Sequence, residues 1–156
     1  MAEGPRTPTA RTIRGQGLVN LVVRGLLRTP GLSRIVGARL VTLHVVGRTS
    51  GRRYTVPVAY LAEEDDLLVG TSFRWAENLR TGEPVAIRLK GRLRWADVQT
   101  FTAEVDVGSG FARMAAANPA FARFNRITVD RDGHADPQDL HAAWLGGARV
   151  IRLSPR

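Results

Sequence analysis

The sequence predicts an α+β fold in which a small antiparallel barrel or sandwich carries helices at both ends of the chain. Short β-branched runs alternate with turn residues at regular spacing between residues 41 and 107. Residues 18–40 and 111–144 show helical patterns instead. The chain has 156 residues, 44% of them hydrophobic, which suits one buried core. We therefore expect a single domain over residues 18–156 behind a flexible tail at residues 1–17.

The first helical segment, residues 18–40, combines two apolar bursts with four arginines and no acid. A Thr-Pro-Gly break at residues 29–31 divides it into two short amphipathic helices. Such helices either cover one end of a sheet or rest on an anionic membrane surface. The break favours two helices packed on the barrel, and membrane contact through residues 18–40 stays open as the alternative.

The part of the chain that follows, from residue 41, is predicted to form strands. Residues 41–46, 54–61 and 67–71 are predicted to form a meander, with the acidic residues 63–66 as a hairpin turn. Pro57 should lie at an edge or a bulge, because proline has no N–H to donate to a sheet. Beyond the meander, the sequence predicts a short helix capped by Ser72 and ending at Gly82, and then strands at residues 85–90 and 93–107.

The last fifty residues are predicted to be mainly helical. Helical patterns at residues 111–117 and 121–126 are separated by Asn118-Pro119. Asp136 followed by Pro137 has the pattern of a helix N-cap with proline in the first turn, which starts a helix through residue 144. Residues 148–153 alternate as a strand at a sheet edge or at the closure of a barrel would.

Composition and motifs exclude several functions. There is no cysteine for a thiolate metal site, and the three histidines do not stand at metal-ligand spacing, so we expect no metal. The sequence also lacks a G-x-S-x-G elbow, a Walker loop and a Rossmann fingerprint. No apolar stretch reaches the roughly 20 residues of a membrane span, and the polar start has no signal-peptide pattern, so we expect a cytoplasmic protein.

The positive charge is concentrated in the first part of the chain. Residues 1–60 hold ten arginines against the single acid Glu3, whereas residues 61–156 hold thirteen basic and thirteen acidic residues. The charge peaks in the loop at residues 47–53, where glycines, hydroxyls and guanidiniums are the ingredients of a phosphate site. The alternative interpretations of this loop are a solvated loop that binds no ligand and a patch that binds nucleic acid. Because few aromatic residues stand nearby, a single compact anion is favoured over nucleic acid.

Two separate motifs strengthen this interpretation. One is Val45-Val-Gly-Arg-Thr-Ser-Gly51, followed by Pro57 and a strand; the other is Trp75-Ala-Glu-Asn-Leu-Arg80. In this order and spacing, residues 40–94 resemble the deazaflavin-dependent nitroreductase family. The resemblance implies a split β-barrel of the flavin-binding type that uses the deazaflavin coenzyme F420.

The resemblance also implies site residues. Arg48, Ser50 and Gly51 would bind the phosphate and acidic tail of the coenzyme, and Pro57 would shape the wall beside its ring. Many members carry arginine where this chain has Tyr54, and some carry lysine where it has Thr49, so Arg52 and Arg53 would supply the missing charge. The remaining candidates precede or belong to the second motif: Thr71, Ser72 and Arg74 toward a phosphate, and Trp75 and Asn78 as supports of the short helix.

By this resemblance the protein would pass hydride from the reduced deazaflavin to a small electrophile, namely a quinone, an enone or a nitro compound. No residue is assigned a certain catalytic role, and Tyr54 and Ser72 are the candidate hydrogen-bond donors to the substrate. The alternatives are a barrel that uses flavin mononucleotide (FMN), and a non-catalytic protein that binds the coenzyme or a membrane surface. We expect no specific nucleic-acid partner, and a homodimer is a further expectation.

Overall fold

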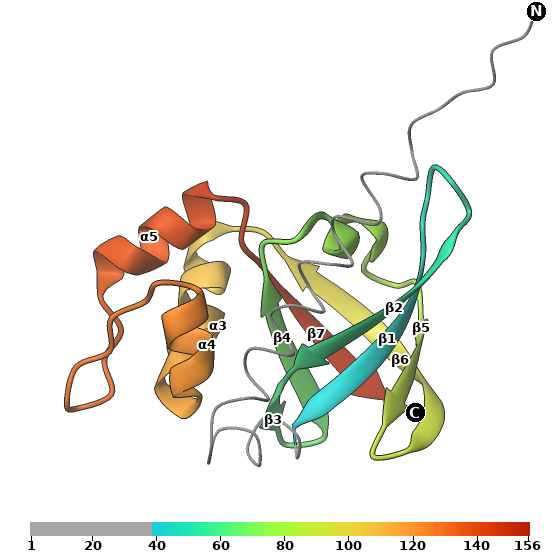
Figure 1. The fold of residues 1–156 in the computed structure, drawn as a ribbon, viewed down its shortest axis with the longest axis horizontal. Coiled ribbons are helices and arrows are strands. Elements are labelled where there is room, and N and C mark those ends of the chain that lie inside the picture. Colours follow the sequence, from blue (N-terminus) through green and yellow to red (C-terminus); the bar gives the residue numbers. More distant parts are fainter. Residues whose placement is uncertain (1–38) are drawn as a thin grey trace, which may run out of the picture.

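The computed structural model describes residues 39–156 and confirms the α+β class (Figure 1). Along the chain its elements are β1 (Leu40–Val46), β2 (Arg53–Ala59), β3 (Leu61–Glu63), β4 (Asp66–Thr71), the 3₁₀ helix η1 (Arg74–Asn78), β5 (Val85–Leu89), β6 (Arg92–Phe101), α3 (Glu104–Ala117), α4 (Pro119–Phe124), α5 (Pro137–Leu145) and β7 (Arg149–Pro155).

The strands form one antiparallel sheet in the order β2-β1-β5-β6-β7-β4-β3. The sheet curls, because inward-facing residues of β1, such as Leu43, share one hydrophobic cluster with Ile151 and Leu153 of β7. Figure 1 shows β1 and β2 crossing in front of β6 and β7. The edge strands β2 and β3 are not paired with each other, so the barrel is split, as expected from the resemblance.

The helices of residues 39–156 pack on one half of the outer surface of this sheet. Phe111 and Met114 of α3 are buried with Leu68 of β4 and Val150 of β7 in a second cluster. Gly110 allows α3 to pack closely on β7, since a Cβ at this position would lie 2.7 Å from a Val150 methyl group. The outer surface of the β1–β5–β6 half carries three exposed hydrophobic side chains instead: Val46, Leu93 and Trp95.

The structure confirms several local predictions. Pro57 lies on the edge strand β2, the turn at residues 63–66 joins β3 to β4, and α5 begins after Asp136, whose Oδ1 accepts a hydrogen bond of 2.8 Å from Gln138 N. The Asn118-Pro119 break separates α3 from α4. Asn118 also caps α4, because its Oδ1 accepts from Ala120 N at 3.0 Å.

Two predictions about strands are wrong, and a third is wrong in part. The run at residues 54–61 is divided into β2 and β3 at Tyr60, and β4 pairs with β3 and β7, so the three strands do not form a meander. The strand expected to reach residue 107 ends at Phe101, because α3 already begins at Glu104. The last predicted strand forms as β7 and joins β6 to β4, so the position at a sheet edge is wrong and the position that closes the barrel is confirmed.

Other predictions lie outside the described residues: the tail at residues 1–17 and all but the last two residues of the helical segment expected over residues 18–40. Leu40 is the first residue of β1, so the bound at residue 40 is wrong. No helix within residues 39–156 has the length and apolar character needed to cross a membrane.

An ion pair next to the C-terminus gives a prediction about acid stability. Asp97 Oδ1 accepts a hydrogen bond of 2.6 Å from Arg156 Nη2, and this bond lowers the pKa of Asp97 below its ordinary value of 3.8. A lowered folded-state pKa means that the contribution is complete above the unfolded-state pKa and disappears as the pH falls through the folded-state pKa. Urea denaturation below pH 3.8 should therefore show a steeper loss of stability in the wild type than in Asp97→Asn. Identical pH profiles of the wild type and Asp97→Asn would contradict this contribution of Asp97 to stability.

Candidate functional site

The basic loop joins β1 to β2 in a compact turn. Gly47 N donates to Arg52 O at 2.7 Å, and Gly51 N donates to Gly47 O at 2.8 Å. Gly51 has a φ of +67°, a conformation that glycine adopts without strain. At Gly47 a Cβ would come within 2.7 Å of Ser50 Oγ and 3.0 Å of the Tyr54 ring, so a larger residue would have to displace these side chains. The loop glycines of the motif therefore have structural reasons that are independent of any ligand.

Asn78 connects the two motifs. Arg48 N donates to Asn78 Oδ1 at 3.0 Å, and Arg48 Nε donates to Asn78 O at 3.3 Å. Asn78 Nδ2 in turn donates to Trp75 O at 3.0 Å. Figure 1 shows the loop between β1 and β2 and the short η1 helix at the same end of the barrel. Two motifs that are thirty positions apart in the sequence thus form one structural unit.

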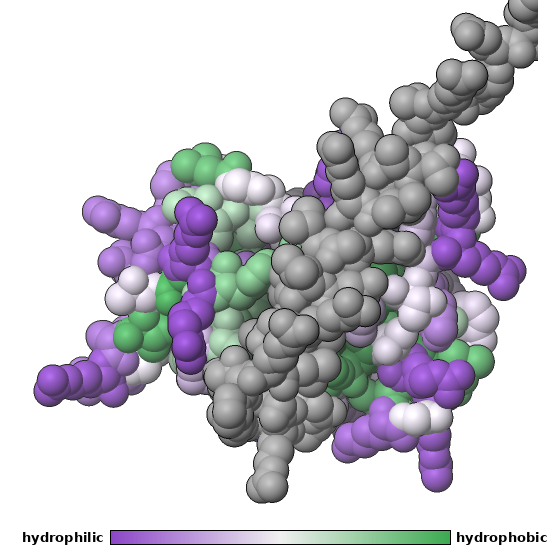
Figure 2. All heavy atoms as spheres, viewed as in Figure 1, coloured by the Kyte–Doolittle hydropathy of each residue, from purple (hydrophilic) through white to green (hydrophobic). Residues whose placement is uncertain are grey.

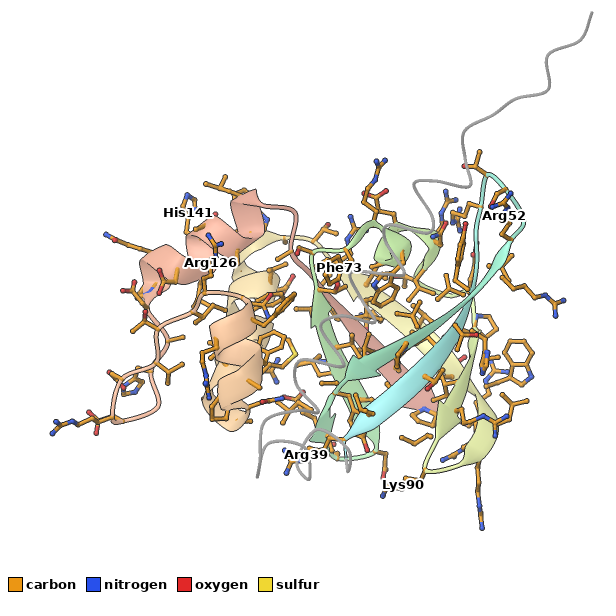
Figure 3. All side chains as sticks on the ribbon, in the orientation of Figure 1. Arg39, Arg52, Phe73, Lys90, Arg126 and His141 are labelled. Carbon is orange, nitrogen blue, oxygen red and sulfur yellow. The ribbon has the colours of Figure 1, made fainter. Side chains whose placement is uncertain are left out.

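The three arginines of the loop have different environments. The Arg48 side chain is 26% exposed and forms an ion pair with Glu83, with 2.8 Å between Nη2 and Oε2. Arg52 and Arg53 are exposed, and neither forms an ion pair within residues 39–156. Arg52 is at the tip of the loop, and Arg39 and Lys90 lie at the opposite end of the barrel (Figure 3). Two of the three arginines thus present their full charge to solvent.

The segment between β4 and η1 departs from the prediction. Ser72 is exposed but does not cap the helix, because η1 follows Phe73 without a side-chain cap. The buried Thr71 accepts a hydrogen bond from Phe73 N at 3.0 Å instead, through its Oγ1. Arg74 is highly exposed and 3.9 Å from Glu77. Ser72 and Arg74 are therefore the side chains of this segment that a ligand can reach.

Trp75 has a polar group that no atom of residues 39–156 satisfies. Its ring packs, partly buried, against the barrel core, and its Nε1 is buried without a hydrogen-bond partner among the residues described. An unsatisfied buried donor costs about 1–3 kcal/mol, so such a group is a natural contact for a bound acceptor.

Tyr54 and Pro57 belong to opposite surfaces of β2. Tyr54 pairs with Val45 and packs against the inner core, and its hydroxyl is 3.4 Å from Ser50 Oγ. Pro57 pairs with Thr42, whose side chain alternates with those of the buried Val41 and Leu43, so it faces the outside of the barrel. The structure thus places Tyr54 beside the loop and does not bring Pro57 to it.

A group of potential metal ligands lies away from this site. Asp130, Asp132 and His134 are exposed, and their ligand atoms lie within 4.8 Å of one another. The backbone N–H groups of Asp132 and His134 donate to Asp130 Oδ1, and the bond from His134 is the largest cause of the lowered pKa of Asp130. The geometry of this turn accounts for the cluster without an ion.

Sequence reasoning did not identify Glu83, Phe73 or Glu77 as neighbours of the site. Glu83 follows Gly82 in the loop before β5, 35 positions from the arginine with which it pairs. Phe73 packs against the core, with its ring 6.0 Å from that of Phe124, and Glu77 is 3.9 Å from both Arg74 and Arg149. The pair of Arg74 and Glu77 has the i,i+3 spacing of a helix, which is visible in the sequence, whereas the other contacts have no local motif.

No protein-family model matches the chain, and no curated protein matches it in sequence. Solved structures with a similar fold include an F420-H2 dependent reductase, at a TM-score of 0.49 and 15% identity over 74% of this chain and 93% of that chain. An FAD-binding protein from Mesorhizobium loti has a TM-score of 0.49 and 13% identity, over 82% and 91%. A domain-swapped dimer has a TM-score of 0.49 and 14% identity, over 94% and 99%. At these identities the comparison concerns the fold alone.

Proposed function

We propose that the loop end of the barrel binds coenzyme F420 and that the protein is a deazaflavin-dependent oxidoreductase acting on a small quinone, enone or nitro compound. The observation that carries the proposal is the Arg48–Asn78 connection, which joins the two motifs of the family resemblance into one unit. A unit built from both motifs is what a shared ligand site would require.

The loop suits the anionic part of such a coenzyme. Arg52 and Arg53 offer guanidiniums that carry no ion pair in the part of the chain that the structure describes, and Thr49 and Ser50 add exposed hydroxyls. Guanidinium–phosphate hydrogen bonds are charge-assisted and can be bidentate. Arg48 completes the set from the η1 side of the loop. In the proposal these residues hold the phosphate and the acidic tail.

The ring of the coenzyme would lie toward η1. Trp75 Nε1 is a buried donor without an acceptor in the part of the chain that the structure describes, and the Tyr54 hydroxyl lies near the loop. When bound, the reduced deazaflavin supplies the hydride. The chain's own residues bind and orient the coenzyme and the acceptor, with Ser72 or Tyr54 donating a hydrogen bond to the substrate. Pro57 has no part in this arrangement, because it faces the other side of β2.

FMN is the second candidate ligand. Glu83 already neutralises Arg48, so the loop presents less net positive charge than its sequence indicates. A single phosphate group needs fewer cations than a polyanionic tail does.

Hydride transfer tests the proposed function. Reduced F420 is incubated with the protein and a quinone, an enone or a nitroaromatic compound, and the return of the oxidised deazaflavin absorbance is followed. We expect protein-dependent oxidation with at least one acceptor. Oxidation with reduced FMN only would identify the FMN enzyme. Tight binding of F420 without turnover of any acceptor class would indicate the non-catalytic coenzyme-binding protein.

The proposal includes a cytoplasmic protein with one coenzyme-binding domain over residues 18–156 and no specific nucleic-acid partner. In Figure 2, hydrophilic side chains project from the periphery of the described part, as expected of a surface in contact with water.

The proposal also includes a homodimer that uses the outer surface of β1, β5 and β6, where Val46, Leu93 and Trp95 are more than half exposed among the described residues. Light scattering should give twice the chain mass for the wild type and the chain mass for Trp95→Glu. A monomeric wild type would contradict the dimer.

A further inference from the structure

We propose that Glu83 is an internal competitor for the anion site: its carboxylate occupies the place on Arg48 that an anionic group of the ligand takes. Glu83 would then determine how tightly the site binds anions. This inference rests on the proposed function, because it assumes that the loop is the anion site.

Arg48 is held in place independently of Glu83. Its backbone N–H is fixed on Asn78 Oδ1 at 3.0 Å, and its Nε is fixed on Asn78 O at 3.3 Å. Only the terminal Nη2 contacts Glu83. If the carboxylate left, Arg48 would keep both bonds to Asn78, one from its backbone and one from its guanidinium Nε, and the guanidinium would stay at the edge of the loop. Arg48 is therefore prepared to receive a different anion.

Glu83 is the partner that is free to leave. Its side chain is 63% exposed, against 26% for Arg48. Its backbone is fixed by hydrogen bonds from Glu83 N to Arg80 O and from the preceding Gly82 N to Val98 O, both 3.1 Å. A change in side-chain rotamer is thus sufficient to release Arg48, and the chain does not have to move.

The exchange of one anion for the other is close to balanced. An exposed ion pair contributes little to stability, because water screens it and two long side chains must be ordered. A ligand phosphate would replace the lost contact with charge-assisted hydrogen bonds to the same guanidinium. The negative charge of Glu83 therefore reduces ligand affinity without being needed for the fold.

Glu64 provides the control for charge. It is the same residue type, is exposed, and lies in the turn between β3 and β4, at the end of the barrel away from the loop (Figure 1). It forms no ion pair within residues 39–156. Glu64→Gln changes the net charge by the same amount as Glu83→Gln, so a difference between the two variants reports the contact with Arg48.

The experiment measures the affinity of the full-length wild type, Glu83→Gln and Glu64→Gln for F420, FMN and inorganic pyrophosphate, at low and at high salt. We expect Glu83→Gln to bind anions about two- to fivefold more tightly than the wild type, and Glu64→Gln to match the wild type. The gain should shrink at high salt, because screening weakens the competing charge. Thermal melts of the three proteins should coincide.

The outcomes separate this inference from the proposed function. Equal tightening in both variants would show a general effect of net charge, and weaker binding by Glu83→Gln would show that Glu83 positions Arg48 for the ligand; either result overturns the inference. Coenzyme binding that is the same in all three proteins overturns the inference and leaves the proposed function standing. Tighter pyrophosphate binding without binding of either coenzyme supports the inference and contradicts the proposed function. Failure of all three ligands to bind any of the proteins overturns both.

Discussion

Phe111→Ala should lower the free energy of unfolding by about 3–5 kcal/mol, the range for removing a buried aromatic side chain. The Phe111 ring is 1% exposed and meets the ring of Phe121 edge-on, with 5.2 Å between the centroids. It also lies against the backbone of β4, since a Cβ on Gly70 would come within 2.8 Å of it. The truncation therefore opens a cavity between α3 and the sheet.

Urea denaturation measures this loss, and Val105→Ala is the control on the same helix. Val105 is 82% exposed, so its truncation should change the stability by less than about 0.5 kcal/mol. If Phe111→Ala were as mild as the control, α3 would not pack on β4 and β7 as described.

Arg48→Ala should weaken F420 binding by about 1.5–3 kcal/mol, the value of a hydrogen bond to a charged group. The substitution keeps the bond from the backbone N–H of residue 48 to Asn78, so the loop stays attached to η1. The change in affinity then reports the guanidinium itself. Equilibrium titration of the coenzyme into each protein gives the two dissociation constants.

Arg88→Ala is the control for charge. Arg88 is an exposed arginine of β5 that faces the outer surface of the sheet, opposite Thr42, and it donates to Gly91 O at 3.2 Å. Its loss should leave the affinity almost unchanged. Equal affinities for the wild type and Arg48→Ala would remove Arg48 from the site.

Local chemistry made parts of the fold predictable from the sequence. Asp136 before Pro137 marked the start of α5, because a carboxylate can satisfy a free N–H there. Pro57 marked an edge strand, because it cannot donate to a neighbour. The prediction of a strand at residues 104–107 is wrong. It rests on Val105 and Val107, which alternate with other residues as in a strand. Acidic residues in the first turn are typical of a helix, and Glu104 and Asp106 occupy that position in α3.

The long-range arrangement could not be predicted in this way. The pairing of β4 with β7 joins segments about eighty residues apart, and no turn motif specifies it. The same limit applies to the site. The arginine loop and the Trp75–Asn78 motif were visible in the sequence, but the bond between Arg48 and Asn78 and the pairing with Glu83 depend on how the barrel closes.

Titration of F420 and FMN, side by side, into the purified full-length protein tests the central claim most directly. The deazaflavin absorbance and the quenching of tryptophan fluorescence, to which Trp75 contributes, report binding. We expect saturable binding of F420 at one molecule per chain, weakened by the double substitution Arg52→Ala and Arg53→Ala. An absence of saturable binding for both coenzymes would contradict the claim that this end of the barrel is a coenzyme site.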